Sequence, residues 1–440
     1  MRLVWLVLLF LLLGGAAIAE TVVRGDLPRR ADLGFGVEEE GALLKVVRVT
    51  AGSPAAQAGL REDDRITAVN GGAFIYGYEG AASLQRLRGG DRVELRLDRA
   101  GAPAVVAFTP QPLALERDPD LDIEYDVLAT RDGARLRTIL SRPPGTTGRL
   151  PVLFFTQWVS CGSLEAQGGA PSQLRTLARR AGMALMRVER SGAGDSLGPA
   201  CHQLDFDTEV RHYREALDRL LRHPWIDPAR VVIYGSSLGA ITAPLVAQGH
   251  DVAGLLVQGG GALTYAERMI NFDRFSLERG GVPPAEIDRR MRESIAFHTE
   301  YLLRGHSPER IALDHPELAG VWARLRGSGD GVHYGRAYAW HQQAAARDLL
   351  AAWTAIEAPV LVVYGEYDQF ETEHGHHLIV DTLNRLRPGS AEFVEIRHAD
   401  HELEIYPSAE DAYAYRGGRA EPELFLGPAV EWLRRVTAPP

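Results

Sequence analysis

Lysine is almost absent from this chain. Lys45 is the only one, so arginine carries nearly all of the positive charge, and the formal net charge is −10 at pH 7. The arginines form no basic cluster. Nucleic-acid binders concentrate positive charge on one face, because contacts with phosphates supply much of their affinity. We therefore expect no nucleic-acid partner.

Cysteine is equally scarce, with only Cys161 and Cys201 in 440 residues. No Cys-x-x-Cys pair is present, which argues against a thiolate zinc site. A group of acids and histidines resembles a metal site in composition, but three histidines within four residues cannot all point inward from one helix face. This group comprises Glu371, Glu373, His374, His376 and His377. We therefore predict no metal.

Long apolar runs are also missing, except at the N-terminus. There Arg2 precedes the apolar run Leu3–Leu13, and Ala17-Ile18-Ala19 forms a small-residue cleavage site. This pattern is typical of a secretory signal peptide over residues 1–19, and the run is shorter than the roughly 20 residues of a membrane-spanning helix. An uncleaved anchor is the alternative. We predict an exported protein, periplasmic or secreted, with no membrane span after cleavage.

The most informative segment that is present is Val231–Gly239. It starts as an apolar, β-branched strand, passes at once into Gly-x-Ser-x-Gly, and continues as what reads as a helix. This layout is a nucleophile elbow, in which a sharp strand-to-helix turn lifts one serine above a sheet. Ser237 is central, whereas Ser236 fails the frame because its second following residue is Leu238. We predict that Ser237 is a catalytic nucleophile.

An acid and a histidine follow in the order Ser, acid, His that elbow-bearing folds use. Asp368 lies just past one predicted strand, and His401 lies just past the next. We expect His401 to take the proton from Ser237, while Asp368 orients the imidazole and stabilises its charged form. His398 is the rival base. The neighbouring acids are interpreted as solvated loop residues: Glu366, Glu371 and Glu373.

These motifs resemble those of the α/β-hydrolase fold, and the resemblance covers residues 119–440. Further segments match that family in the right order, namely the strand Leu150–Phe155, the strand Met183–Val188 with its Gly-rich turn Glu189–Ser196, the amphipathic stretch Phe206–Arg222 and the link Pro224–Pro228. The resemblance implies the α/β class, with a mostly parallel sheet, a helical cap and an active site at one edge of the sheet.

The resemblance also implies two backbone donors for the oxyanion. One is the N–H of Leu238, directly after the nucleophile, and the other belongs to the loop after residue 155, where we choose the N–H of Val159. The loop reads Gln157-Trp158 where the family often carries His-Gly. The N–H of Trp158, one register away, is therefore the alternative. Losing one such donor typically costs about 3 kcal/mol of transition-state stabilisation.

A long insertion, residues 261–356, separates two predicted sheet strands and resembles the mobile cap of many α/β-hydrolases. Helices are expected within it at Ile287–Leu303 and Ala337–Leu350. Its aromatic and histidine side chains could face the pocket, but on helices such residues more often pack the cap's own core. They include Tyr334, Tyr338, Trp340 and His341.

Residues 31–112 form a separate unit that resembles a PDZ domain, a small β-rich α+β fold. The matching motifs are the loop Leu33–Val37, the segment Ser53–Leu60 and the segment Asp64–Gly71. In PDZ domains the loop amides bind the C-terminal carboxylate of a peptide, which adds a strand to the sheet edge.

The resemblance gives this carboxylate-binding role to Leu33, Gly34 and Phe35, and it implies that a helix at Ala82–Leu87 lines the groove. A packing module with an empty or blocked groove is the alternative.

Two remaining features concern loops at the edge of the large sheet. Cys161 and Cys201 follow consecutive predicted strands, so in an oxidising compartment we predict a disulfide between them rather than two free thiols.

The turn Gly192-Ala193-Gly194 does not open a dinucleotide-binding fingerprint, because Leu197 stands where the third glycine belongs. We interpret it as a tight turn at the pocket floor, and we expect no cofactor.

The combined interpretation is an exported serine hydrolase that cleaves carboxylic esters through an acyl-enzyme, with a PDZ domain for peptide or substrate recognition. A serine peptidase of the same fold is the first alternative, because export and a PDZ domain both suit polypeptide substrates. A non-catalytic PDZ scaffold is the second, and the ordered Ser, Asp and His argue against it. The expected partners are a small ester or peptide substrate and a peptide C-terminus at the PDZ groove.

Overall fold

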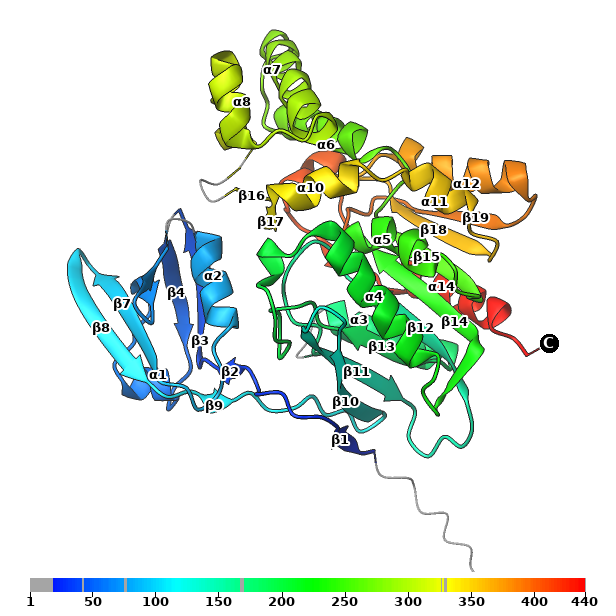
Figure 1. Cartoon of the computed structure of the whole chain (residues 1–440), viewed down its shortest axis with the longest axis horizontal. Coiled ribbons are helices and arrows are strands. Elements are labelled where there is room, and N and C mark those ends of the chain that lie inside the picture. Colours follow the sequence, from blue (N-terminus) through cyan, green and yellow to red (C-terminus); the bar gives the residue numbers. More distant parts are fainter. Residues whose placement is uncertain are drawn as a thin grey trace, which may run out of the picture.

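The computed structural model describes residues 19–41, 43–74, 77–166, 170–325, 327 and 331–439. Figure 1 shows a small β-rich body, coloured blue to cyan, beside a larger α/β body that carries a helical cap. Almost all of the predicted signal peptide, residues 1–18, lies outside the described residues. Within the described ranges, no helix is long and apolar enough to cross a membrane.

A nine-stranded sheet forms the centre of the large body. Its strands are, in sheet order, β1 (Thr21–Val23), β10 (Asp122–Ala129), β11 (Arg135–Arg142), β13 (Ala184–Val188), β12 (Leu150–Thr156), β14 (Ile226–Ser236), β15 (Gly254–Gln258), β18 (Val360–Gly365) and β19 (Ala391–Ile396). Only the pairs β10–β11 and β11–β13 are antiparallel. The central parallel strands are buried on both faces, which explains why the sequence shows them as continuous apolar runs.

Helices cover both faces of this sheet. One face shares a core with α4 (Phe206–Leu220), α5 (Leu238–Ala247), α11 (Leu349–Thr354) and α12 (Glu373–Leu386). The opposite face packs against α3 (Ala170–Ala181) and α14 (Glu423–Val436). Short elements complete the body: η1 (Cys201–Gln203), β20 (Glu404–Ile405), α13 (Ala409–Tyr413) and β21 (Arg419–Ala420).

The first strand of the large sheet precedes the small body in sequence. In β1, Val22 pairs in parallel register with Glu124 of β10. The described part of the chain therefore enters the large sheet first, leaves it to build the small body, and returns at β10. The sequence analysis missed this strand, because three residues are too few to show a period of two.

The small body is a sheet of six strands with two helices. Its elements are β3 (Phe35–Glu40), β4 (Leu43–Val49), α1 (Pro54–Gln57), β5 (Arg65–Val69), β6 (Gly72–Ala73), α2 (Gly77–Gln85), β7 (Val93–Arg99) and β8 (Ala102–Phe108). At its neck, β2 (Ala31–Asp32) pairs antiparallel with β9 (Gln111–Pro112). The helix predicted at residues 82–87 begins earlier than expected, as α2.

Two arginines at the neck, Arg29 and Arg30, directly precede β2 and form ion pairs between the two bodies. Arg29 Nη2 donates to Glu165 Oε1 at 2.8 Å, and Arg30 Nη2 donates to Glu165 Oε2 at 2.8 Å. The Arg30 N–H donates to Asp195 Oδ1 at 2.9 Å. Both carboxylates are almost fully buried, so these ion pairs hold the small body against the loops that follow β12 and β13.

The cap lies between β15 and β18. Its elements are α6 (Tyr265–Arg279), α7 (Pro284–His298), η2 (Thr299–Leu303), α8 (Pro308–Asp314), η3 (Pro316–Leu318), α9 (Val321–Arg324), β16 (Val332–His333), β17 (Arg336–Ala337) and α10 (Tyr338–Ala345). The helix expected at residues 337–350 is in fact divided. Its first part is α10 in the cap, whereas α11 packs Trp353 into the core of the sheet.

Candidate active site

Ser237 stands at a strained turn between β14 and α5. Its φ of 53° and ψ of −120° lie in a region that residues with a side chain rarely adopt. A Cβ on Gly239 would lie 1.9 Å from the oxygen of Thr156, and a Cβ on Gly235 would lie 2.4 Å from the oxygen of Gly239. Both glycines of the Gly-x-Ser-x-Gly motif are thus required by close backbone contacts.

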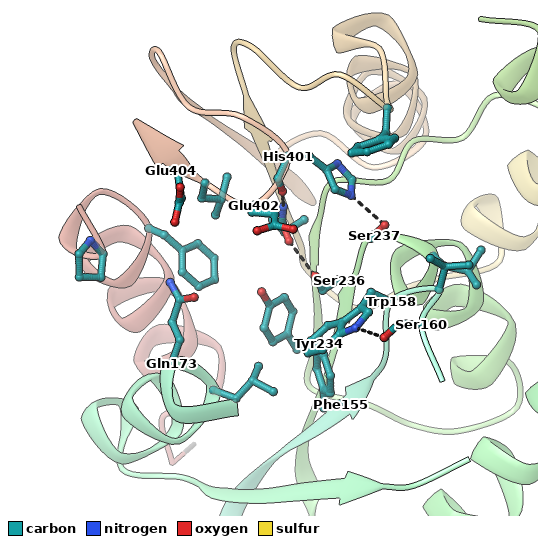
Figure 2. Close-up of a pocket in the computed structure, with 18 of the residues that line it drawn as sticks. Phe155, Trp158, Ser160, Gln173, Tyr234, Ser236, Ser237, His401, Glu402 and Glu404 are labelled. Atoms are coloured by element: carbon teal, nitrogen blue, oxygen red, sulfur yellow. Dashed lines mark hydrogen bonds between the residues drawn. The ribbon is translucent and has the colours of Figure 1, made fainter. Parts of the chain in front are cut away.

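The three residues predicted to act together form one hydrogen-bonded series. His401 Nε2 lies 2.8 Å from Ser237 Oγ, and His401 Nδ1 lies 2.7 Å from Asp368 Oδ2. Figure 2 shows the imidazole of His401 pointing at Ser237. The other oxygen of Asp368 accepts hydrogen bonds from the amides of Phe370, at 2.8 Å, and Glu371, at 2.9 Å. The carboxylate is therefore held in place before it orients the histidine.

The pKa values of the pair follow from burial and mutual attraction. Burial lowers the pKa of His401, but its attraction and hydrogen bond to Asp368 prevail, so this pKa lies above its usual value of 6.5. Burial raises the pKa of Asp368, but His401 outweighs it and holds that pKa below the usual 3.8. Asp368 is thus an anion at neutral pH, and it stabilises the protonated imidazole.

The rival residues occupy other positions. The ring of His398 stacks on the ring of Tyr367, with the ring centroids 5.4 Å apart. The backbone N–H of His398 donates to Glu366 Oε2 at 2.7 Å. Ser236 Oγ donates to Gln258 Oε1 at 2.9 Å rather than to a histidine. Among these serine and histidine candidates in the described chain, it is His401 and Ser237 whose side chains lie within hydrogen-bonding distance of each other.

Gln258 is a residue that the sequence analysis missed. It ends β15, and its Nε2 donates to the backbone oxygen of His401 at 2.6 Å. Together with Ser236 it ties the elbow to the histidine loop. A polar residue at the end of an otherwise apolar strand, Gly254–Gln258, was the available signal.

The residues predicted to supply the oxyanion donors, Leu238 and Val159, line the same pocket as Ser237. Leu238 is the first residue of α5, so its N–H has no acceptor within the helix. No acceptor within the described chain is found for the amides of Val159 or Trp158 either. The Trp158 side chain turns into the pocket, where its Nε1 donates to Ser160 Oγ at 2.7 Å (Figure 2). This explains how a bulky residue fits where glycine is usual, while the choice between Val159 and Trp158 stays a prediction.

The predicted disulfide is present. Cys161 and Cys201 are bonded with a Cα–Cα distance of 5.7 Å. The bond joins the loop that follows β12 to the loop that follows β13. It lies beside the segment that would supply the second oxyanion donor.

A pocket of about 1040 Å³ lies in front of Ser237. The body and the cap each contribute aromatic and aliphatic walls, among them Phe155, Trp158, Tyr234, Phe425, Leu426, Tyr265, Met269, Phe272 and Phe370. Figure 2 shows Gln173 and Glu404 on the side away from the serine. The volume is at the upper end of the range for drug-sized ligands, so it has room for a substrate larger than a short-chain ester.

The four cap side chains singled out by the sequence divide between the pocket and the cap core. Tyr334 and His341 line the pocket. Trp340 is fully buried, and its Nε1 donates to Glu209 Oε2 at 3.2 Å. Tyr338 packs against the cap core.

The residues expected to bind a peptide carboxylate lie together where β3 starts. β3 is the edge strand of the small sheet, and Gly34 takes the left-handed φ of 68° that such a loop needs. The Gly34 N–H donates to Asp32 Oδ1 at 3.2 Å. A carboxylate of the chain itself therefore accepts from one of the three amides.

Two other groups singled out by the sequence are placed differently from what was expected, and Glu371 is buried rather than solvated. In the described chain, no group of three His, Cys, Asp or Glu side chains is arranged to hold a metal ion; His376 packs on Tyr364 at 4.8 Å, and Glu371 pairs with Arg268. The turn at residues 192–194 is absent from the pocket lining. The expectation that it forms the pocket floor is wrong, because Asp195 directs this turn toward the arginines of the neck.

Comparisons with known proteins agree with this architecture. The model of the alpha/beta hydrolase family matches residues 167–414, which is more than half of the chain, and a PDZ domain model matches residues 45–99. A polyketide transferase of Stachybotrys chlorohalonatus is 31% identical over 120 residues, which cover 27% of this chain and 37% of that protein. The chain thus spans little more than a third of the length of that relative.

Similar solved structures include Est1E of Butyrivibrio proteoclasticus with bound ferulic acid, at 13% identity and a TM-score of 0.45, covering 72% of this chain and 99% of that one. An esterase of Pyrococcus furiosus has 11% identity and a TM-score of 0.45, covering 74% of this chain and 96% of that one. The family matches confirm the predicted fold class and the PDZ resemblance. The chain therefore belongs to the alpha/beta hydrolase family, and it carries a PDZ domain inserted behind the first strand of its large sheet.

Proposed function

We propose that the protein is an exported serine hydrolase that cleaves carboxylic esters. The observation that carries this proposal is the series Ser237–His401–Asp368, with contacts of 2.8 and 2.7 Å, beside a large pocket with apolar walls. A serine is a weak nucleophile by itself, and a hydrogen-bonded base held by an acid is the arrangement that activates it.

In the proposed mechanism Ser237 Oγ attacks the acyl carbon and its proton passes to His401 Nε2. The N–H groups of Leu238 and Val159 stabilise the oxyanion of the tetrahedral intermediate. Collapse of the intermediate expels the alcohol, which takes the proton from His401. Water, deprotonated by His401, then releases the acid from the acyl-enzyme, and the chain needs no cofactor for these steps.

The pocket walls favour esters with a bulky apolar group over very small or fully charged substrates. Phe155 and Tyr234 on the body and Phe272 on the cap give surfaces on which aliphatic or aromatic groups can pack. A cap over the elbow also restricts entry, so we expect small molecules to be cleaved and folded proteins to be excluded.

A serine peptidase is the second candidate, because a PDZ domain lies next to the hydrolase in the same chain. In our proposal the PDZ domain binds a peptide C-terminus or a substrate through the amides of Leu33, Gly34 and Phe35, with the peptide added along β3. Asp32 would have to release the Gly34 amide first.

Export is part of the proposal. The N-terminal pattern of residues 1–19 motivates it. The disulfide Cys161–Cys201 supports it, because thiols of cytosolic proteins are kept reduced.

The test is covalent labelling with a fluorophosphonate, followed by turnover of a panel of p-nitrophenyl esters and peptide amides. Ser237→Ala should abolish labelling and lower kcat by several orders of magnitude, as loss of a triad member does. Ser236→Ala should cost far less, since its hydroxyl only helps to hold Gln258.

His401→Ala should be as inactive as Ser237→Ala, and His398→Ala should stay active. Labelling that survives Ser237→Ala would refute the proposed nucleophile. Cleavage of polypeptides with negligible turnover of short-chain esters would favour the peptidase instead.

A further inference from the structure

The loop that follows β12 is held through its carbonyl oxygens by two arginines. Arg190 Nη2 donates to the oxygen of Gln157 at 2.8 Å, and its Nη1 donates to the oxygen of Ser160 at 2.7 Å. Arg336 Nε donates to the oxygen of Val159 at 3.1 Å. This is the loop in which the proposed function places the second oxyanion donor.

Arg336 reaches this loop from the cap. It lies on β17, yet its side chain is fully buried and its Nη1 donates to the oxygen of Cys201 at 3.1 Å. Cys201 is bonded to Cys161, at the end of the same loop. One cap residue therefore contacts both loops that the disulfide joins.

A single buried acid lies between the two arginines. Glu209 pairs with Arg190 at 2.7 Å and with Arg336 at 3.1 Å. Burial raises the pKa of Glu209, but the two guanidinium groups outweigh it and hold that pKa below its usual value. Burial lowers the pKa of Arg336 to about 10, so this side chain remains charged at neutral pH. Two cations against one anion leave net positive charge facing the loop carbonyls.

The direction of a carbonyl fixes the direction of the next amide. In a trans peptide the C=O and N–H point in opposite directions. The N–H groups that follow Gln157, Val159 and Ser160 are those of Trp158, Ser160 and Cys161, and they are therefore turned away from the arginines. The Val159 N–H lies in the peptide between two peptides held in this way, so it is positioned through its neighbours. A hydrogen bond from a charged donor also polarises the peptide, which strengthens its own N–H as a donor.

We propose that Arg336 is a positioning residue for the oxyanion loop: from the cap, it holds Val159 and Cys201 so that the loop amides face the reacting carbonyl. The inference rests on the proposed serine-hydrolase function. It means that the oxyanion site is complete only when the cap is seated on the body. Oxyanion donors act because they are fixed beforehand, and small displacements of positioned groups cost large factors in rate.

The test compares Arg336→Lys and Arg336→Met with a matched cap control, Arg310→Met, whose exposed side chain pairs with Asp314 within α8. Arg336→Lys keeps the buried charge opposite Glu209 but loses the forked donor, so it is the variant expected to fold. Folding is checked by thermal unfolding and by the absence of free thiols. The two measurements are kcat and KM on a small p-nitrophenyl ester, and the inhibition constant of an aryl trifluoromethyl ketone. Ser237 adds to that ketone to form a tetrahedral oxyanion, as its proton passes to His401.

We expect kcat of both Arg336 variants to fall roughly 10- to 100-fold, below the loss for removing one donor outright. The inhibition constant of the ketone should rise by a similar factor, KM should change less than about threefold, and Arg310→Met should match the wild type. A folded Arg336→Lys with wild-type kcat and ketone affinity would overturn the inference, and so would a loss of kcat without weaker ketone binding. A wild-type enzyme that fluorophosphonate does not label would instead refute the proposed function.

Discussion

At the scale of single residues, the site combines a strained serine with a histidine held on several sides. The left-handed backbone of Ser237 costs on the order of 1–3 kcal/mol, which the close packing of the two motif glycines maintains. The ring centroids of His401 and Phe370 are 4.9 Å apart. The backbone oxygen of His401 accepts a hydrogen bond from Gln258, and its N–H donates to Gln369. The imidazole would therefore need little reorganisation to accept the proton in the proposed mechanism.

The electrostatics of His401 predict the pH dependence of the reaction. The base must be neutral, so kcat/KM should rise with pH through the pKa of His401, with a midpoint above 6.5 because Asp368 raises it. In Asp368→Asn the effect of burial is no longer opposed, so the midpoint should move to lower pH. Maximal activity should also fall by about 10⁴-fold, as in the serine protease triad. The pH profile of ester hydrolysis measures both effects.

His398→Asn provides the control, since its ring stacks on Tyr367 away from the serine. It should leave the midpoint in place. An acid limb that does not move in Asp368→Asn would show that another group controls the profile.

At the scale of elements, the loops after β12 and β13 are held by bonds to each other, to the cap and to the segment that leads into the PDZ domain. The disulfide joins them, Arg190 and Arg336 hold the first, and Arg30 holds Asp195 in the second. Loops have few apolar contacts of their own, so such bonds replace the packing that fixes a helix or strand.

Removing the disulfide should therefore destabilise the hydrolase core. The bond closes a loop of 40 residues, and chain-entropy arguments give about 4 kcal/mol for a loop of this length. We expect Cys161→Ala/Cys201→Ala to lower the free energy of unfolding by up to this amount in urea titrations followed by tryptophan fluorescence. Reductant should destabilise the wild type similarly and leave the double variant unchanged. A double variant as stable as the oxidised wild type would contradict this expectation.

At the scale of the whole molecule, the PDZ domain is inserted into the hydrolase rather than attached in front of it. β1 belongs to the large sheet, and the chain leaves and re-enters the neck at adjacent points, where the Leu113 N–H donates to the oxygen of Arg30 at 2.9 Å. Two connections and the ion pairs at Glu165 hold the domain near the catalytic body. A peptide bound by the PDZ domain, as proposed, would thereby be kept at high effective concentration near the candidate site.

Deletion of residues 31–112, with a short glycine linker between Arg30 and Leu113, tests the role of the PDZ domain. The deletion keeps β1 and both neck arginines, and the triad lies wholly downstream. We expect kcat on a small ester to change little, and KM to rise only for substrates with a free C-terminal carboxylate. Steady-state kinetics on both substrate types measures this.

The same carboxylate substrate capped as an amide is the control, and its KM should not respond to the deletion. A collapse of small-ester turnover in a folded truncation would show that the PDZ domain supports the structure of the catalytic body instead.

Local sequence patterns predicted the fold class and the PDZ domain, and they singled out Ser237, Asp368 and His401 as candidates. These patterns are readable because each one depends on residues that are neighbours in the sequence. The elbow glycines, the apolar strands and the polar residues just past them are signals of that kind. The three-residue strand β1 and the divided helix at residues 337–350 carried no such signal. Their placement depends on partners elsewhere in the chain, namely β10 and the sheet core.

The sequence alone determined which residues the proposed chemistry would use: Ser237 in its motif, an acid and a histidine in order, and two cysteines to pair. Only the tertiary structure decided which groups hold those residues in place. Arg336 and Val159 are 177 positions apart, and Gln258 and His401 are 143 apart. No local pattern relates them, because their contacts exist only after the sheet, the cap and the PDZ neck have been assembled around the site.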